Sequence, residues 1–233
     1  MSFRSLLKAG TGMRGYGRVA ALVTLCLLIV VLVVPASALA KGSYGASITL
    51  KALSPTVKAG ATVSLTAKVR PAEGSVTFQA HGAGGAWADV ATKAVPVSGL
   101  VKLDVKPLRH TWYRAIWTRD SGATVKSNTV WVKVFAIVNV YAEPGVYATG
   151  AGTPIMIHGM VIPKSPDGQV WINIMYGTTT VAHFPVDLTA GPGDASSFSA
   201  TFNAMAPGTY IIKARVGRTA DFFGANGFTS ITL

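Results

Sequence analysis

The sequence predicts an all-β protein with two tandem antiparallel β-sandwiches. They follow an N-terminal hydrophobic helix that we interpret as an export signal. Three observations predict this fold class. From residue 45 onward, apolar and polar residues alternate in short runs, and turn residues such as Gly-Pro and Asp-Gly separate those runs. The same region also contains an internal repeat. Short alternating runs divided by turns are typical of sandwiches and barrels, whereas parallel α/β sheets need helices between strands.

The segment 61–70 shows the alternation most clearly, with Val63, Leu65, Ala67 and Val69 on one side and polar residues between them. Successive side chains of a strand point to opposite faces, so this pattern predicts a strand with one buried side. Similar runs predict strands at 48–53, 75–80, 100–105, 112–118, 129–134, 138–142, 155–161, 170–176, 181–188, 197–202, 210–216 and 228–233.

The repeat divides the chain after the leader into two copies. The segment 74–78 (GSVTF) corresponds to 168–172 (GQVWI), and 112–115 (WYRA) corresponds to 209–212 (TYII). Two similar copies, each long enough for about seven strands, predict two sandwiches in tandem. We therefore expect a leader at 1–40, a first sandwich at 41–136 and a second at 137–233. The join at 134–140 (VFAIVNV) is apolar, so one strand is expected to pass almost directly into the next.

The leader carries four basic residues and no acidic ones, followed by an apolar run at 20–34. Ala38-Leu39-Ala40 resembles the small-residue site at which signal peptides are cleaved. An uncleaved membrane anchor is the alternative, because the uncharged stretch 19–40 is long enough to cross a hydrocarbon core of about 30 Å. Either interpretation predicts an exported protein, extracellular or at the cell surface, with membrane contact only through this segment if it is retained.

A family resemblance follows from the motifs. A glycine ahead of the strand at 61–70, then G-x-V-x-F at 74–78 and Y-x-A at 113–115, resembles the bacterial immunoglobulin-like and fibronectin-III-like tandem repeats of the cell envelope. The second copy departs from it, with Ile172 and Ile212 in place of the Phe and the Ala. The resemblance implies immunoglobulin-like sandwiches, with Tyr113 and Tyr210 as structural tyrosine corners. The single cysteine, Cys26, lies in the leader, so no disulfide is expected after it.

Basic charge is concentrated in the first copy. Residues 41–136 contain 13 Lys and Arg against 4 Asp and Glu, whereas residues 137–233 contain 4 against 5. A local excess of this size attracts polyanions, although it also serves as an ordinary solvated surface. No stretch has the spacing of a nucleic-acid reader, and an exported chain does not meet nucleic acid in the cytoplasm. The expected partners are an anionic cell-envelope polymer, a glycan or another surface protein, and not nucleic acid.

One group of aromatic and basic residues in the first copy is a candidate binding site. If Tyr113, Ala115 and Trp117 face inward, Trp112 and Arg114 face outward, and Trp131 and Lys133 do the same on the last strand. These four residues, here called the Trp/Arg ladder, would lie side by side on neighbouring strands. Indole and guanidinium groups bind sugars and anions. The alternative is cross-strand packing of indoles against aliphatic stems, without any ligand.

Catalytic and metal-binding patterns are not apparent. The sequence has no nucleophile elbow, phosphate loop, zinc helix or nucleotide fingerprint. His81, His110, His158 and His183 fall in separate predicted loops and strands, so no metal site and no cofactor are expected. The leading hypothesis is an exported, non-catalytic binding or spacer module whose basic first domain contacts anionic envelope polymers. A carbohydrate-binding accessory protein using the ladder is the second hypothesis, and an enzyme is the third.

Overall fold

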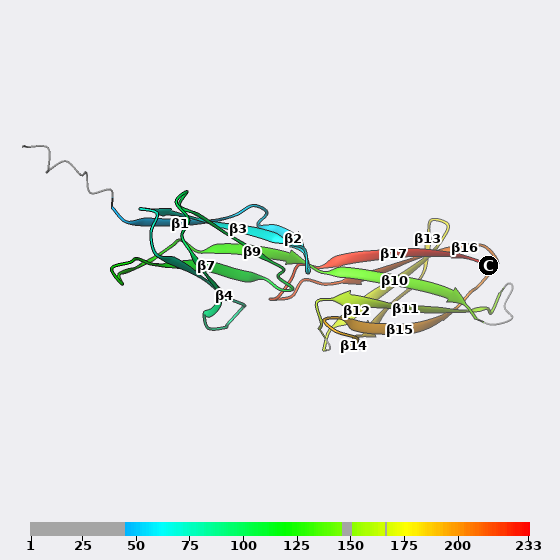
Figure 1. Cartoon of the computed structure of the whole chain (residues 1–233). Helices are drawn as coiled ribbons and strands as arrows, with labels where there is room; N and C mark the ends of the chain where they lie inside the picture. The colour runs from blue at the N-terminus through cyan, green and yellow to red at the C-terminus, as the bar shows by residue number, and fades with distance from the viewer. Residues whose placement is uncertain (1–44, 146–150, 166) are drawn as a thin grey trace, which may run out of the picture. The chain divides into compact units, whose positions relative to one another are not determined.

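The computed structural model describes residues 45–145, 151–165 and 167–233 (Figure 1). All regular secondary structure within these ranges is β-strand. The predicted export segment and its cleavage site lie outside them. Within the same ranges, no helix has the length and apolar character needed to span a membrane.

The first sandwich packs a three-stranded sheet against a six-stranded one. The order in the small sheet is β1-β3-β6, all antiparallel: β1 (Ser47–Ala52), β3 (Val63–Arg70) and β6 (Leu100–Val105). The order in the large sheet is β2-β9-β7-β4-β5, with β8 paired to β7. Its strands are β2 (Thr56–Lys58), β4 (Ser75–His81), β5 (Ala88–Ala94), β7 (Thr111–Thr118), β8 (Thr124–Lys126) and β9 (Val130–Phe135).

The second sandwich packs two four-stranded sheets. One has the order β10-β11-β15-β14: β10 (Ile137–Pro144), β11 (Pro154–Ile162), β14 (Thr189–Ala190) and β15 (Ser196–Asn203). The other has the order β13-β12-β16-β17: β12 (Gln169–Tyr176), β13 (Thr179–Asp187), β16 (Thr209–Val216) and β17 (Ala225–Thr232). Both are antiparallel throughout.

Strand order identifies the architecture. In both sandwiches the first, second and fifth long strands form one sheet, and the third, fourth, sixth and seventh form the other. This is the arrangement of immunoglobulin-like and fibronectin-III-like domains. The predicted fold class, two tandem immunoglobulin-like sandwiches, is confirmed.

Each sandwich has a hydrophobic core of its own. Period-two alternation produces both: β3 buries Val63, Leu65, Ala67 and Val69, the face that the sequence predicts. The first cluster of buried side chains extends in sequence from Ile48 to Val132 and the second from Ala136 to Ile231. Two separate clusters mean that each sandwich buries its apolar surface mainly within itself. The exact domain boundaries at 40 and 136 stay a prediction.

A tyrosine corner closes the second core. The Tyr210 hydroxyl accepts hydrogen bonds from the backbone N–H groups of Met205 and Ala206 at 3.0 and 3.1 Å and donates one to the Ala206 carbonyl at 2.8 Å. One side chain therefore satisfies three backbone groups in the turn before β16. Tyr113 occupies the same place on β7 and is buried, and this burial raises the pKa of its phenol.

The join between sandwiches is a single residue. Strand β9 ends at Phe135 and β10 begins at Ile137, which leaves only Ala136 between them. The loop between β16 and β17 returns to this point, where Phe223 forms a parallel bridge to Phe135. The Phe223 N–H donates to the Val134 carbonyl at 2.8 Å, and the Ala136 N–H donates to the Phe223 carbonyl at 2.9 Å.

Candidate functional site

Three exposed lysines lie on the outer face of sheet β1-β3-β6. Lys51 of β1 stands opposite Thr66 of β3, which in turn stands opposite Lys102 of β6. Lys68 of β3 lies in the next row, between Thr49 and Leu100. Lys51, Lys68 and Lys102 are all exposed, and we call them the lysine face. They belong to this face because even-numbered positions of β3 point away from the core, where odd-numbered ones are buried.

The lysine face is compact. Strands of a sheet lie about 4.8 Å apart and residues two positions along a strand about 6.8 Å apart, so the three Cα atoms lie within roughly 10 Å of one another. A hollow of about 310 Å³ opens among Lys51, Lys68, Thr49, Thr66 and Leu100. An anion that enters it would meet two ammonium groups and two hydroxyl-bearing side chains.

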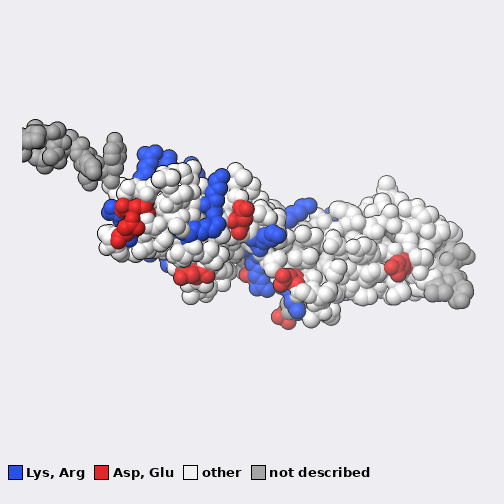
Figure 2. All heavy atoms as spheres, in the orientation of Figure 1, with Lys and Arg blue, Asp and Glu red and all other residues white. Residues whose placement is uncertain are grey.

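Few acidic groups offset this charge. Asp104 is the carboxylate on the neighbouring strand β6, and it accepts a hydrogen bond from the Ser64 hydroxyl. Among the described residues, no ion pair within 4.0 Å involves a lysine of the face. In the view of Figure 2, Lys and Arg gather over the first sandwich and near the join, whereas the far part of the second sandwich shows few. The mutual repulsion of unpaired lysines is relieved by a polyanion.

The structure brings the four residues of the Trp/Arg ladder together. Strand β7 pairs with β9, and Trp112 stands directly opposite Trp131. Both indoles, like Arg114 and Lys133, are half-buried on the outer side of the sheet. Tyr113, Ala115 and Trp117 face the core, as the alternation predicts.

The indole faces of the ladder are covered by neighbouring groups. Trp112 and Trp131 stack with ring centroids 5.4 Å apart and an interplanar angle of 7°. His81 of β4 stacks on the other side of Trp112 at 5.1 Å, and the Lys133 ammonium lies 4.9 Å from the Trp131 ring centroid. A sugar ring needs an open aromatic face, and these contacts occupy both indoles. The geometry favours cross-strand packing, the alternative left open by the sequence.

Two further residues, His81 and Trp87, pack against the Trp/Arg ladder, and the sequence patterns did not point to them. His81 stacks on Trp112, and Trp87 meets His81 edge-on at 4.3 Å. The Arg114 guanidinium lies 4.1 Å from the Trp87 ring centroid, and its Nε donates to Gln79 at 2.7 Å. Trp87 lies in the Gly-rich loop before β5, a stretch without alternation, so no pattern in the sequence placed it beside the ladder. Arg114 is thereby fixed between two neighbours.

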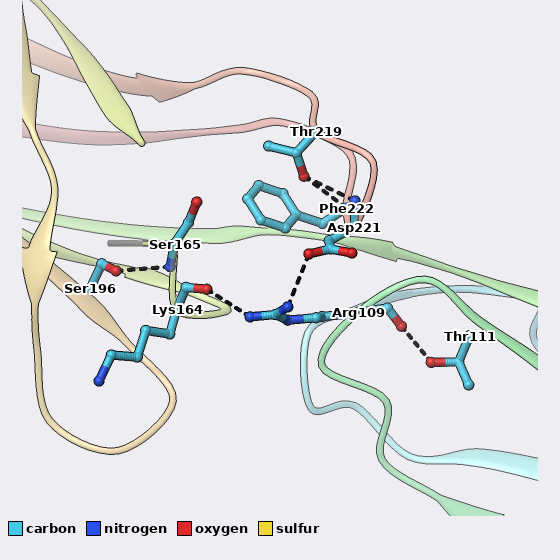
Figure 3. A network of polar contacts seen from close by, with 8 residues as sticks. All are labelled: Arg109, Thr111, Lys164, Ser165, Ser196, Thr219, Asp221 and Phe222. Carbon is cyan, nitrogen blue, oxygen red and sulfur yellow. Dashed lines mark hydrogen bonds and ion pairs between the residues drawn. The ribbon is translucent and has the colours of Figure 1, made fainter. Parts of the chain in front are cut away.

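A polar network connects the two sandwiches at the join (Figure 3). Arg109 of the first sandwich forms an ion pair with Asp221 at 3.0 Å, and its other terminal nitrogen donates to the Lys164 carbonyl at 3.1 Å. The Thr219 hydroxyl accepts from the N–H groups of Asp221 and Phe222, which holds the turn that presents Asp221. Arg109 therefore contacts two loops of the second sandwich at once.

His110 lies beside this network and is buried. Its Nδ1 accepts the Val134 N–H at 2.9 Å, so the neutral imidazole carries its proton on Nε2. The ring packs edge-on against Phe223 and Trp131, at 4.8 and 5.5 Å between centroids. Burial lowers the pKa of His110; the positive charge of Arg218 lowers it further, Asp221 acts in the opposite direction, and Lys133 adds a smaller lowering effect.

We expect this histidine to make the chain less stable in acid. Its pKa in the folded chain lies below the ordinary value of about 6.5, so the unfolded chain binds the proton more tightly. Its contribution is therefore complete above pH ~6.5 and decreases as the pH falls from there toward the folded pKa. Urea unfolding midpoints between pH 8 and pH 5 measure this loss. His110→Gln should show a smaller loss than the wild type, whereas His183→Gln, at an exposed position of β13, should match the wild type; equal losses in all three would contradict the assignment.

Within the described ranges, no group of three or more His, Cys, Asp or Glu side chains is placed to hold a metal ion. His158 and Glu143 approach to 3.9 Å on neighbouring strands, and their side chains are 42% and 66% exposed.

Comparison with known proteins gives structural likeness only. No protein-family profile and no curated protein matches the chain. A human OSCAR ligand-binding domain has 15% identity and a TM-score of 0.32, covering 80% of this chain and 97% of its own. A tetra-tandem repeat from the extending region of a large adhesion protein has 14% identity and a TM-score of 0.42, covering 81% of this chain and 49% of its own. A marsupial T cell receptor has 12% identity and a TM-score of 0.34, and the match covers 81% of this chain and 95% of the receptor chain. The fold assignment rests on the strand order of the chain itself.

Proposed function

We propose that the chain is an exported, non-catalytic binding module that holds to anionic polymers of the cell envelope through its first sandwich. The observation that carries this proposal is the lysine face, where exposed lysines from three neighbouring strands lie close together and two of them, Lys51 and Lys68, line a hollow. The second sandwich then serves to space or extend the binding domain.

Repeated anionic groups suit this face better than a single anion does. Each lysine is a point charge on a flexible stem, without the fixed fork with which arginine grips one carboxylate or phosphate. Three such charges, carried by residues whose Cα atoms lie within roughly 10 Å of one another, form a platform for a chain of negative groups, and the attraction is long-ranged and screened by salt. Because each lysine contributes only a flexible point charge, binding through the face should be weak per site and cumulative along a polymer.

Neutralising the face tests the proposal. The double variant Lys51→Gln with Lys68→Gln should bind linear polyphosphate, used as a model polyanion, about tenfold or more weakly at low salt, since each lost ammonium–anion contact costs about 1 kcal/mol. The control, Lys58→Gln with Lys126→Gln, removes the same charge from exposed positions on the other sheet. Surface plasmon resonance at 50 and 300 mM salt measures both.

The two variants separate a specific face from general basicity. The lysine face is supported if the first variant loses much more affinity than the control. Equal losses would mean that binding follows net charge alone, and the proposed face would then be wrong. Affinity of the wild type that does not change with salt would also contradict it.

The second hypothesis, a glycan-binding role for Trp112, Arg114, Trp131 and Lys133, stays a prediction. Both indoles are stacked between neighbours, and Arg114 is held by Gln79 and Trp87. These contacts do not favour it over packing.

A further inference from the structure

We propose that the second sandwich carries a separate site for an acidic saccharide, on the outer face of sheet β13-β12-β16-β17. Its principal residues are Trp171, Arg215, Lys213, Asn173 and His183, which we call the Trp171 site. It is distinct from the lysine face and from the Trp/Arg ladder, and the sequence patterns did not single it out.

Strand register assembles the site from three strands. Trp171 of β12 stands opposite Arg215 of β16. In the next row, Asn173 stands between His183 of β13 and Lys213 of β16. The neighbouring positions Val170, Ile172, Ala214 and Val216 are buried, so the five residues of the site all point outward.

Trp171 differs from the ladder tryptophans in being open. It is 43% exposed, whereas Trp112 and Trp131 are half-buried and stacked on each other. One neighbour, His183, lies 5.0 Å away between ring centroids at an angle of 41°, which is a tilted contact and not a stack. An indole with an open face beside polar groups is the arrangement that receives the apolar face of a sugar ring.

Two hollows with shared wall residues lie on this face, and the indole lines the smaller of them. One, of about 250 Å³, is lined by Trp171, Asn173, Thr180, His183, Lys213 and Arg215. The other, of about 460 Å³, continues from Lys213 and Arg215 toward the join and is lined also by Arg218, Phe223 and Asn226. Lys213 and Arg215 line both, so a ligand of more than one sugar unit that passes over these two side chains would contact both hollows.

The charge of the site is positive and uncompensated. Lys213, Arg215 and Arg218 line the hollows, and in the described part of the chain none of them forms an ion pair within 4.0 Å. Residues 137–233 contain only 4 basic residues, against 5 acidic ones, and three of the basic residues line these hollows. The Lys213 ammonium lies 5.5 Å from the Phe228 ring and the Arg218 guanidinium 4.8 Å from the Phe223 ring, contacts that leave their charge available.

The amide of Asn173 provides a further, independent observation. Asn173 lines the smaller hollow, and its side-chain oxygen is buried without a hydrogen-bond partner among the described residues, so the side chain has to turn before a ligand donor reaches that oxygen. An unpaired buried acceptor is unfavourable, and its cost is removed when a donor reaches it. A sugar hydroxyl is such a donor, whereas phosphate and carboxylate oxygens are not.

Together these groups specify the ligand class. The open indole takes a sugar face, Asn173 takes a hydroxyl, and Arg215 beside the indole takes a carboxylate in charge-assisted bonds. A bare polyanion would leave Trp171 unused, and a neutral sugar would leave the cations unused. The fitting ligand is an oligosaccharide that carries carboxylate groups.

Isothermal titration calorimetry with the full chain tests the site, using oligogalacturonate as the acidic saccharide, cellohexaose as a neutral one and linear polyphosphate as an anion without sugar. Oligogalacturonate should bind most tightly at the Trp171 site. Trp171→Ala and Arg215→Gln should each weaken it by about tenfold, the effect of one lost charge-assisted or stacking contact. Trp171→Phe, which retains an aromatic face, should recover part of the loss.

Tyr141→Ala and Lys164→Gln are the matched controls, because they remove an aromatic ring and a cation of the same sandwich outside the site. Circular dichroism checks that every variant folds. The site is wrong if the chain does not bind oligogalacturonate, if cellohexaose binds equally well, or if Trp171→Ala leaves affinity unchanged. Because Lys51→Gln with Lys68→Gln should leave this binding intact, failure here is distinguishable from failure of the lysine face.

Discussion

Trp117→Ala should destabilise the first sandwich by about 3–5 kcal/mol, the usual cost of truncating a buried tryptophan. Trp117 is fully buried in the first core, and its indole N–H donates to the Glu73 carbonyl at 2.7 Å. Alanine would leave both a large cavity and an unpaired carbonyl. For a domain of this size the midpoint of thermal unfolding should fall by roughly 12 °C or more.

Tryptophan fluorescence can follow this loss selectively. Trp87, Trp112 and Trp131 remain as reporters of the first sandwich, and Trp171 reports on the second. Val97→Ala is the control, because Val97 is fully exposed in the same sandwich. A drop of less than about 1 kcal/mol for Trp117→Ala would mean that this side chain is not part of a packed core.

Gly159→Ala should lower the free energy of unfolding of the second sandwich by about 3 kcal/mol or more, at the upper end of the costs of overpacking. Gly159 lies within β11, and a Cβ atom there would fall 2.1 Å from the Asn139 carbonyl oxygen and 2.5 Å from the Phe198 ring. The oxygen belongs to the backbone of the paired strand β10, so it cannot swing aside as a side chain does. Strands β10 and β11 must move apart here, and the Phe198 ring must shift as well.

Gly217→Ala is the comparison for this glycine, because a Cβ atom at Gly217 would meet nothing within 4 Å. Chemical denaturation of both variants, followed by circular dichroism, measures the difference. If the two alanines cost the same, the close approach of β10, β11 and Phe198 would not be what limits this position.

Much of the fold was predictable because burial imposes a period of two on each strand. The alternation at 61–70 predicted both the strand and its inward face, and the pattern at 112–118 predicted that Tyr113, Ala115 and Trp117 enter the core. The edge strand β5 was not predicted. Six of its seven residues are exposed and none is fully buried, so no alternation marks it.

The candidate sites depended on information that the alternation lacks. The outward direction of Trp112 and Trp131 followed from the pattern, but their mutual stacking follows from the pairing of β7 with β9. The lysine face and the Trp171 site each need the register of three strands. Lys51, Lys68 and Lys102 are up to 51 positions apart in sequence, and hydrogen-bonded pairing across β3 alone brings them together.

The contacts that surround the join at Ala136 have a mechanical consequence. Tension between the two sandwiches does not pass through Ala136 alone, because Phe223 is bonded to Val134 and Ala136, and Arg109 is bonded to Asp221 and Lys164. Bending at the link would have to break these contacts together and would also expose the rings of His110 and Phe223 to water. A pulling force applied to the two sandwiches is thus shared over several bonds. The contacts at the join should therefore break together, in one cooperative step.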